Sequence, residues 1–150
     1  MNEYLPLSSV VAAITLPDGR IVEPSALVGA ARSGRRVVIT GDTRPCASTI
    51  EASQGADLLV HEATFADEEA ERAKETGHST AREAAGVARD AGVRQLALTH
   101  FSARYSRDPS DLQREAREIF SNVVLARDGM EISVPYASGE EEEEQSEPTS

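Results

Sequence analysis

The sequence contains no tryptophan, and aromatic residues make up only 4% of its 150 residues. This argues against single-strand nucleic-acid binding by stacking, which needs several exposed rings. Cys46 is the only cysteine, so an intrachain disulfide and a multi-cysteine zinc site are both excluded. No apolar run approaches the about 20 residues that cross a bilayer, and the first ten residues lack a signal-peptide pattern. We therefore expect no membrane association and a cytoplasmic location.

Positive charge is also scarce, since the formal net charge is −11 and the pI is about 4.7. Such a balance argues against nucleic-acid binding, which normally requires a basic face. Two features weaken this argument. Six acidic residues lie in the last eleven positions, and the chain has fourteen arginines beside its one lysine. Guanidinium groups that can bind phosphate with two hydrogen bonds are therefore available.

Short apolar runs alternate with helical patterns along the chain, which predicts an α/β fold in a single domain. Residues 137–150, with five consecutive glutamates, are expected to form a disordered acidic tail. We predict a hairpin at 10–22 with its turn at 17–20, strands at 37–40, 57–60 and 96–99, helices at 48–54, 65–75, 80–91 and 109–121, and edge strands at 123–125 and 130–134. Thr80 and Glu83 are expected to form a capping box for the helix at 80–91, and Asp108 is expected to cap the helix at 109–121, with Pro109 in its first turn.

The three histidines, His61, His78 and His100, each lie at the edge of a predicted element, and Asp42 follows a predicted strand. Strand ends in α/β sheets are where active sites assemble. Each residue also has a structural explanation. Asp42 could cap a turn or helix, His61 could be a core residue or a supporting hydrogen-bond partner, His78 could simply precede its helix, and His100 could bond backbone. Together, however, a carboxylate and imidazoles at adjacent strand ends suit Zn²⁺.

Four motifs carry a resemblance to a known family. They are residues 40–45 (Thr-Gly-Asp-Thr-Arg-Pro), 59–65 (Leu-Val-His-Glu-Ala-Thr-Phe), 78–80 (His-Ser-Thr) and 98–105 (Leu-Thr-His-Phe-Ser-Ala-Arg-Tyr). In this order and spacing, over about residues 10 to 136, the chain resembles the ribonuclease Z family of the metallo-β-lactamase superfamily. The resemblance implies half of an αββα sandwich and zinc-dependent cleavage at the 3′ end of precursor tRNA. Residues 1–15 would be a divergent segment, 16–136 the carboxy-terminal half of the domain, and 137–150 the tail.

The resemblance also implies roles for single residues. Asp42 would bridge two zinc ions and His100 would bind one of them, whereas His78 would not bind metal but would assist the leaving oxygen. Residues expected to contact substrate phosphate are Arg104, Ser102 and Arg82, although exposed arginines are also common without such a role. Residues expected to support the ligands by hydrogen bonds are His61, Glu62 and Thr43.

The chain departs from the family pattern in lacking the motif His-x-His-x-Asp-His, a further ligand histidine and the arm that grips tRNA. We therefore expect an incomplete fragment, inactive alone, that associates as a homodimer or with the missing amino-terminal half. Two alternatives remain open. The chain could be a non-catalytic, partner-binding half-domain, or belong to another phosphodiesterase of the same fold.

Overall fold

The computed structural model describes residues 13–23 and 34–136, which fall into two compact units. Arg35–Tyr136 forms one unit, and the hairpin belongs to the other. The expected acidic tail and most of the expected divergent segment lie outside the described residues. No helix in the described ranges is long and apolar enough to cross a membrane.

The predicted hairpin is confirmed where it is described. Strands β1 (Ile14–Thr15) and β2 (Ile21–Val22) pair antiparallel. Gly19 has a φ of 82°, which glycine adopts without steric cost, and its N–H donates to the Leu16 carbonyl at 2.9 Å. The turn that the sequence signalled is therefore the turn that joins the strands.

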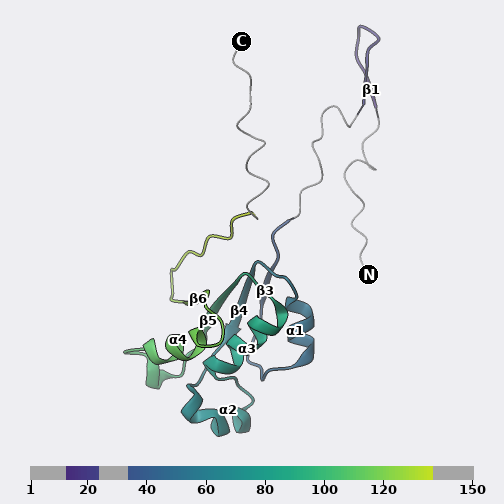
Figure 1. The fold of residues 1–150 in the computed structure, drawn as a ribbon. Coiled ribbons are helices and arrows are strands. Elements are labelled where there is room, and N and C mark those ends of the chain that lie inside the picture. Colours follow the sequence, from purple (N-terminus) through teal and green to yellow (C-terminus); the bar gives the residue numbers. More distant parts are fainter. Residues whose placement is uncertain (1–12, 24–33, 137–150) are drawn as a thin grey trace. The chain divides into compact units, whose positions relative to one another are not determined.

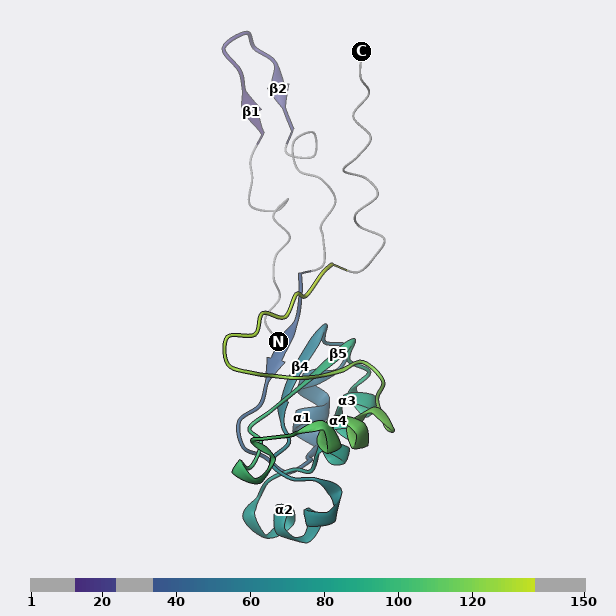
Figure 2. The same cartoon turned by 90° about the vertical axis from the view of Figure 1, so that its left-hand side faces the viewer.

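The larger unit contains a four-stranded, wholly parallel sheet in the order β3-β4-β5-β6. Each strand lies beside the strand that precedes it in the sequence, and the sheet grows in one direction. Right-handed crossovers between such strands place every connecting segment on the same face of the sheet. Figures 1 and 2 show α1 (Ala47–Ser53), α3 (Ala81–Ala91) and α4 (Ser110–Arg117) on that face. The strands are β3 (Val37–Ile39), β4 (Leu58–Glu62), β5 (Gln95–Thr99) and β6 (Val123–Leu125).

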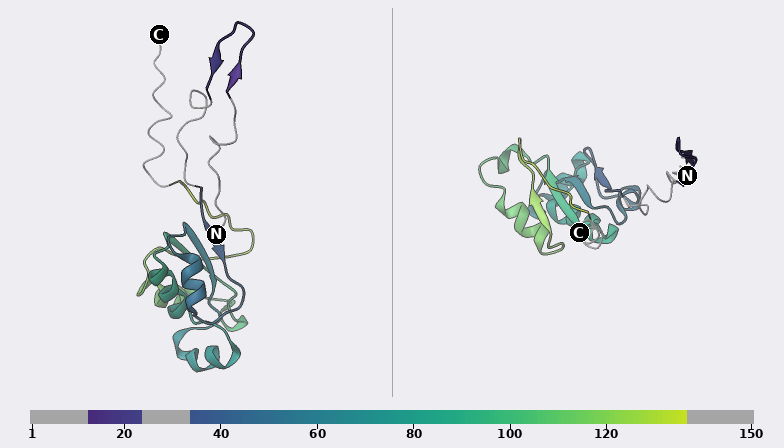
Figure 3. Two further views of the ribbon diagram at one scale, coloured as in Figure 1. Left: turned by 90° about the vertical axis from the view of Figure 1, so that its right-hand side faces the viewer. Right: turned by 90° about the horizontal axis from the view of Figure 1, so that it is seen from above.

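Helix α3 is the central helix of this layer. The predicted capping box is present, since the Thr80 hydroxyl accepts from the Glu83 N–H and the Glu83 carboxylate from the Thr80 N–H. Gly92 ends the helix in the left-handed conformation. The remaining helix, α2, spans Ala70–Thr76. Two short 3₁₀ turns are η3 (Asp67–Glu69) and η4 (Ala103–Tyr105). Figure 3 shows α2 beyond the carboxyl ends of the strands.

The hydrophobic core lies between the helices and one face of the sheet. Its strand residues include Leu59, Leu96, Leu98 and Val123, which register on the same face. The buried face of α3 is made of small residues: Ala81, Ala84, Ala85, Val87, Ala88 and Ala91. Small side chains let the helix approach the sheet closely.

The opposite face of the sheet has no helical layer among the described residues. It carries Val37 and Ile39, which are 46% and 72% exposed, beside the buried Leu58 and Ala97. Figure 2 shows the segment after β6 crossing this face. One sheet with helices on one side and an apolar second side is half of a two-sheet sandwich.

Two predicted boundaries and one predicted strand were wrong. Strand β4 continues through His61 and Glu62 instead of ending before them, because both pair with β5. The helix expected at 65–75 begins later, because Phe65 forms a parallel bridge with Thr80. Residues 130–134 are not a strand. The chain turns before them, where the Met130 N–H donates to the Arg127 carbonyl at 3.0 Å, and the segment that follows does not pair with β6.

Helix α4 also differs from the prediction, which placed Asp108 as its cap and Pro109 in the first turn. Pro109 is itself the capping residue, and the Asp108 carboxylate accepts from the Ser110 N–H at 2.9 Å. The helix therefore begins one residue later than expected, and it ends at Arg117, four residues before the expected end at 121.

Candidate metal centre

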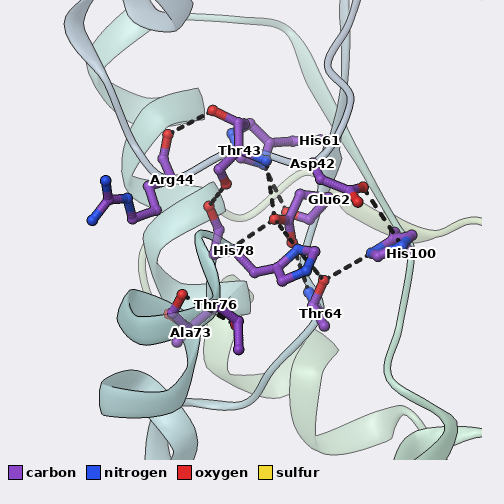
Figure 4. Close-up of polar contacts among 12 residues, drawn as sticks. Asp42, Thr43, Arg44, His61, Glu62, Thr64, Ala73, Thr76, His78 and His100 are labelled. Carbon is purple, nitrogen blue, oxygen red and sulfur yellow. Dashed lines mark hydrogen bonds and ion pairs between the residues drawn. The ribbon is translucent and has the colours of Figure 1, made fainter.

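Four loop segments meet at the carboxyl edge of the parallel sheet (Figure 4). Asp42 follows β3, Glu62 is the last residue of β4, and His100 directly follows β5. His78 lies between α2 and α3, after Gly77 has ended α2 with a φ of 80°. Since parallel strands end at the same edge, side chains distant in sequence converge there.

Asp42, His78 and His100 form a cluster whose potential ligand atoms all lie within 4.8 Å of one another. The two imidazole rings are stacked, with centroids 5.3 Å apart. Asp42 Oδ1 lies 3.5 Å from His100 Nε2. Ligand bonds of about 2.1 Å in tetrahedral geometry place neighbouring ligand atoms about 3.4 Å apart. The spacing of Asp42 and His100 is therefore close to that of neighbouring ligands on one divalent cation, and the oxygen and nitrogen donors of the cluster suit such an ion.

The cluster is open to solvent on one side. The side chains of Asp42 and His100 are 59% and 50% exposed. That exposure leaves room for additional ligands and for a substrate, as a catalytic metal site requires. The described residues offer three ligand groups in this cluster, so any complete four-ligand shell would need a water molecule or a residue from elsewhere.

The buried carboxylate of Glu62, 1% exposed, organises the base of the cluster. Its Oε1 accepts from the Thr43 N–H at 3.2 Å, the Ser79 N–H at 3.0 Å and His78 Nδ1 at 2.9 Å. Its Oε2 accepts from the N–H and the hydroxyl of Thr64, at 2.9 and 2.8 Å. A buried carboxylate needs such donors to offset the loss of hydration. One side chain thus fixes three of the converging segments.

The contact with Glu62 also orients His78. Because Nδ1 donates to the carboxylate, the Nε2 edge of the ring is left for the cluster or for a substrate. A carboxylate behind an imidazole stabilises the protonated ring when a proton is taken up. Nε2 of His78 can therefore exchange a proton beside Asp42 and His100.

Two residues in this arrangement were not identified from the sequence. Thr64 lies with its hydroxyl oxygen 2.8 Å from His100 Nδ1, and so connects Glu62 to a second histidine. Ser79, fully buried, donates from its hydroxyl to the Thr43 carbonyl at 2.6 Å and so holds the loop that carries Asp42. Both residues lie inside the motifs that resemble the ribonuclease Z family, and the sequence gives no other indication of their role.

The backbone at His100 is unusual, since its φ of 56° lies in the left-handed region. A non-glycine residue pays a steric cost of about 1 to 2 kcal/mol there. The adjoining chain is held by the hydrogen bonds Ala63 N–H to Thr99 carbonyl, 2.9 Å, and Ser102 N–H to Thr64 carbonyl, 3.0 Å. These bonds keep the strained residue in place, so that the imidazole meets Asp42.

His61 lies apart from the cluster. It is fully buried on the helix-facing side of β4, and its Nδ1 lies 2.7 Å from the Glu62 carbonyl. Burial lowers the pKa of His61, because the charged imidazolium would lose its hydration. Of the three residues expected to support the ligands, Glu62 and Thr43 lie in the hydrogen-bond network behind the cluster, whereas the His61 side chain bonds only to the Glu62 carbonyl among the described residues.

The two arginines expected to contact phosphate are engaged within the chain. Arg104 pairs with Glu69, and Arg82 pairs with Glu118 at 2.6 Å and with Asp67 at 3.4 Å. Ser102, on the same loop as Arg104, is the N-cap residue of the short η4 turn, where its side chain makes no capping hydrogen bond. Both guanidinium groups are partly exposed, so phosphate would have to compete with these carboxylates.

Comparison with known proteins bears on the same region. A family profile described as the beta-lactamase superfamily domain matches residues 12–101. The ribonuclease Z of Gemmatimonas aurantiaca is 66% identical over 121 residues, which is 81% of this chain and 38% of the relative. The ribonuclease Z of Haloferax volcanii is 59% identical over 128 residues, covering 85% and 40% respectively. The chain thus spans about 40% of the length of these relatives.

Solved structures give the same result. The short form of human tRNase Z superimposes with a TM-score of 0.54 at 36% identity, covering 77% of this chain and 37% of that one. The metallo-β-lactamase fold protein YhfI from Bacillus subtilis superimposes with a TM-score of 0.56 at 32% identity, covering 72% and 40%. The predicted α/β half-sandwich and the resemblance to ribonuclease Z are confirmed.

Proposed function

The chain belongs to the β-lactamase superfamily, and from this premise we propose that it is the carboxy-terminal part of a ribonuclease Z, a zinc-dependent endonuclease that cuts precursor tRNA at its 3′ end. One observation carries the proposal. The cluster of Asp42, His78 and His100, organised on Glu62, lies in the part of the chain that closely resembles ribonuclease Z relatives.

Zinc is the metal we propose for the cluster, with Asp42 and His100 as its ligands from this chain. A carboxylate oxygen and an imidazole nitrogen are donors that zinc accepts. When bound, zinc would polarise a phosphoryl oxygen and lower the pKa of water at the site. A second zinc ion would need ligands beyond those described, since this chain supplies one cluster of three such groups in its described part.

His78 is proposed to donate a proton to the departing 3′ oxygen. Its distance to Asp42 and His100 would also allow it to bind metal. We favour the acid role because the partner of Nδ1 is the buried Glu62 carboxylate, which stabilises a positively charged ring. The imidazole can then present a proton at Nε2 toward the open side of the site.

Arg104, Ser102 and Arg82 remain our proposed contacts for substrate phosphate. Glu69 holds Arg104, and Glu118 with Asp67 holds Arg82. Such partly exposed ion pairs are weak, so a phosphodiester could replace the carboxylate with a bidentate bond.

The remaining part of the enzyme is the partner we propose for the apolar side of the sheet, where Val37 and Ile39 are exposed. An apolar sheet face is normally covered by another layer. A homodimeric assembly and a cytoplasmic location belong to the same proposal.

A graft into a complete relative tests the proposal. In the Gemmatimonas aurantiaca ribonuclease Z, the matching 121 residues would be replaced by those of this chain. We expect the chimera to bind zinc and to cleave precursor tRNA, whereas the chain alone should do neither at the level of a two-zinc enzyme. Cleavage of a small chromogenic phosphodiester without cleavage of precursor tRNA would favour another phosphodiesterase. Failure on both substrates with a folded chimera would favour a binding half-domain.

Variants of the chimera separate the roles of the histidines. His100→Ala should lose zinc, and activity should fall with the metal content. His78→Ala should keep its zinc and lose turnover by about 10² to 10⁴-fold, as expected for a positioned acid. Arg89→Ala, which breaks only an exposed pair with Asp90, is the control and should behave as the parent. Loss of zinc in His78→Ala would make that residue a ligand.

A further inference from the structure

The hydroxyl of Thr64 lies at the crossing of the polar contacts at this site. Its oxygen is 2.8 Å from Glu62 Oε2, 2.8 Å from His100 Nδ1 and 3.2 Å from His78 Nδ1. A hydroxyl has one proton to donate and two lone pairs to accept with. The direction of each contact can therefore be worked out.

Glu62 Oε2 already accepts from the Thr64 N–H, which can only donate, so this oxygen is an acceptor. The Thr64 hydroxyl lies 2.8 Å from the same carboxylate oxygen, which can only accept, so the hydroxyl donates its proton there. His78 Nδ1 lies closer to Glu62 Oε1, at 2.9 Å, and donates there. The contact that remains is with His100, and in it the hydroxyl oxygen can only accept.

We propose that Thr64 is a positioning residue that fixes His100 in the tautomer with its proton on Nδ1. Nε2, which lies 3.5 Å from Asp42 Oδ1, then keeps its lone pair and would be free to bind a metal that the two residues held. This inference rests on the proposed function, in which His100 is a metal ligand. Glu62 bonds directly to His78, and through the Thr64 hydroxyl it also orients His100.

The backbone of Thr64 is held independently of its hydroxyl. Its N–H donates to Glu62 at 2.9 Å, and its carbonyl accepts from the Ser102 N–H at 3.0 Å. The residue is 7% exposed. Valine has almost the same shape as threonine, so Thr64→Val should remove the hydroxyl and leave the loop in place.

The test is ¹⁵N nuclear magnetic resonance of the histidine rings of this chain at about pH 8.5, where imidazoles are neutral. The chemical shift distinguishes a protonated ring nitrogen from an unprotonated one, with neither metal nor RNA present. We expect His100 to carry its proton on Nδ1 in the parent chain and in Thr64→Ser. Thr64→Val should shift it to a mixture of both tautomers. Thr76→Val, which removes a hydroxyl bonded to the Arg72 carbonyl at 2.8 Å, is the matched control.

Two results would overturn the proposal. One is an Nε2–H tautomer of His100 in the parent chain, which needs no variant and so does not depend on how Thr64→Val folds. The other is an unchanged Nδ1–H tautomer in Thr64→Val. Neither result depends on cleavage of precursor tRNA. A failed graft with the expected tautomers would count against the function alone.

Discussion

Replacing Glu62 by glutamine keeps the size of the side chain and exchanges one acceptor oxygen for an NH₂ donor. The carboxylate accepts three N–H bonds at Oε1 and two bonds, both from Thr64, at Oε2. The NH₂ group of the glutamine can take the position of either Oε1 or Oε2. At Oε1 it would face three donors, so the less costly orientation places it at Oε2.

In that orientation the Thr64 hydroxyl can rotate and accept from the new NH₂ group, but the Thr64 N–H cannot. One buried donor without a partner costs about 1 to 3 kcal/mol. Bonds to a charged acceptor are also stronger than bonds to a neutral one, which adds about 1 kcal/mol or more over the three remaining bonds. We expect Glu62→Gln to lower the free energy of unfolding by about 2 to 5 kcal/mol.

Urea denaturation of the chain, followed by circular dichroism, measures this difference. Glu83→Gln is the control, because glutamine can also complete the capping box with Thr80. It should change the free energy of unfolding by less than about 0.5 kcal/mol. If both variants were equally stable, the network on Glu62 would not hold the site together as we argue.

Three further predictions concern other parts of the chain. Hydrogen bonds from Ser48 and Thr49 lower the pKa of Cys46 to about 7, so alkylation by iodoacetamide should reach half its maximal rate near that pH; Ser48→Ala should move the midpoint upward. Burial lowers the pKa of His61, so the unfolded chain takes up a proton that the folded chain excludes, and the free energy of unfolding should fall as pH drops below about 6.5. His61→Leu should reduce this slope in denaturation curves between pH 5.5 and 7.5, and an identical slope would contradict the reasoning. Thr80→Ala removes the cap of α3 and should lower the free energy of unfolding by about 1 kcal/mol in the same assay, whereas Thr80→Ser should keep most of it.

The sequence predicted where the four strands of the parallel sheet lie and that Asp42 and His100 converge, because both depend on local signals. Short β-branched runs mark the strands, and polar residues at the ends of parallel strands must meet at one edge. The cap of α3 was predictable for the same reason, since Thr80 and Glu83 interact across a single turn.

The role of Glu62 could not be worked out from the residues alone. A glutamate after a strand is usually a solvated surface residue, and nothing local shows that five donors surround it. Those donors come from three loop segments that only the tertiary fold brings together. The boundary of β4 was missed for the same reason, because pairing with β5 carries the strand through two polar residues.

The left-handed backbone of His100 has a consequence for protein engineering. Glycine tolerates a φ of 56° freely, and asparagine tolerates it better than histidine does. A laboratory evolution experiment that rewards heat resistance alone should therefore enrich both at position 100, with a gain of about 1 kcal/mol. The most stable clones from such a library would be those in which the imidazole is gone. A useful selection for robust versions of this chain would have to monitor whether the imidazole at position 100 is kept, as well as temperature.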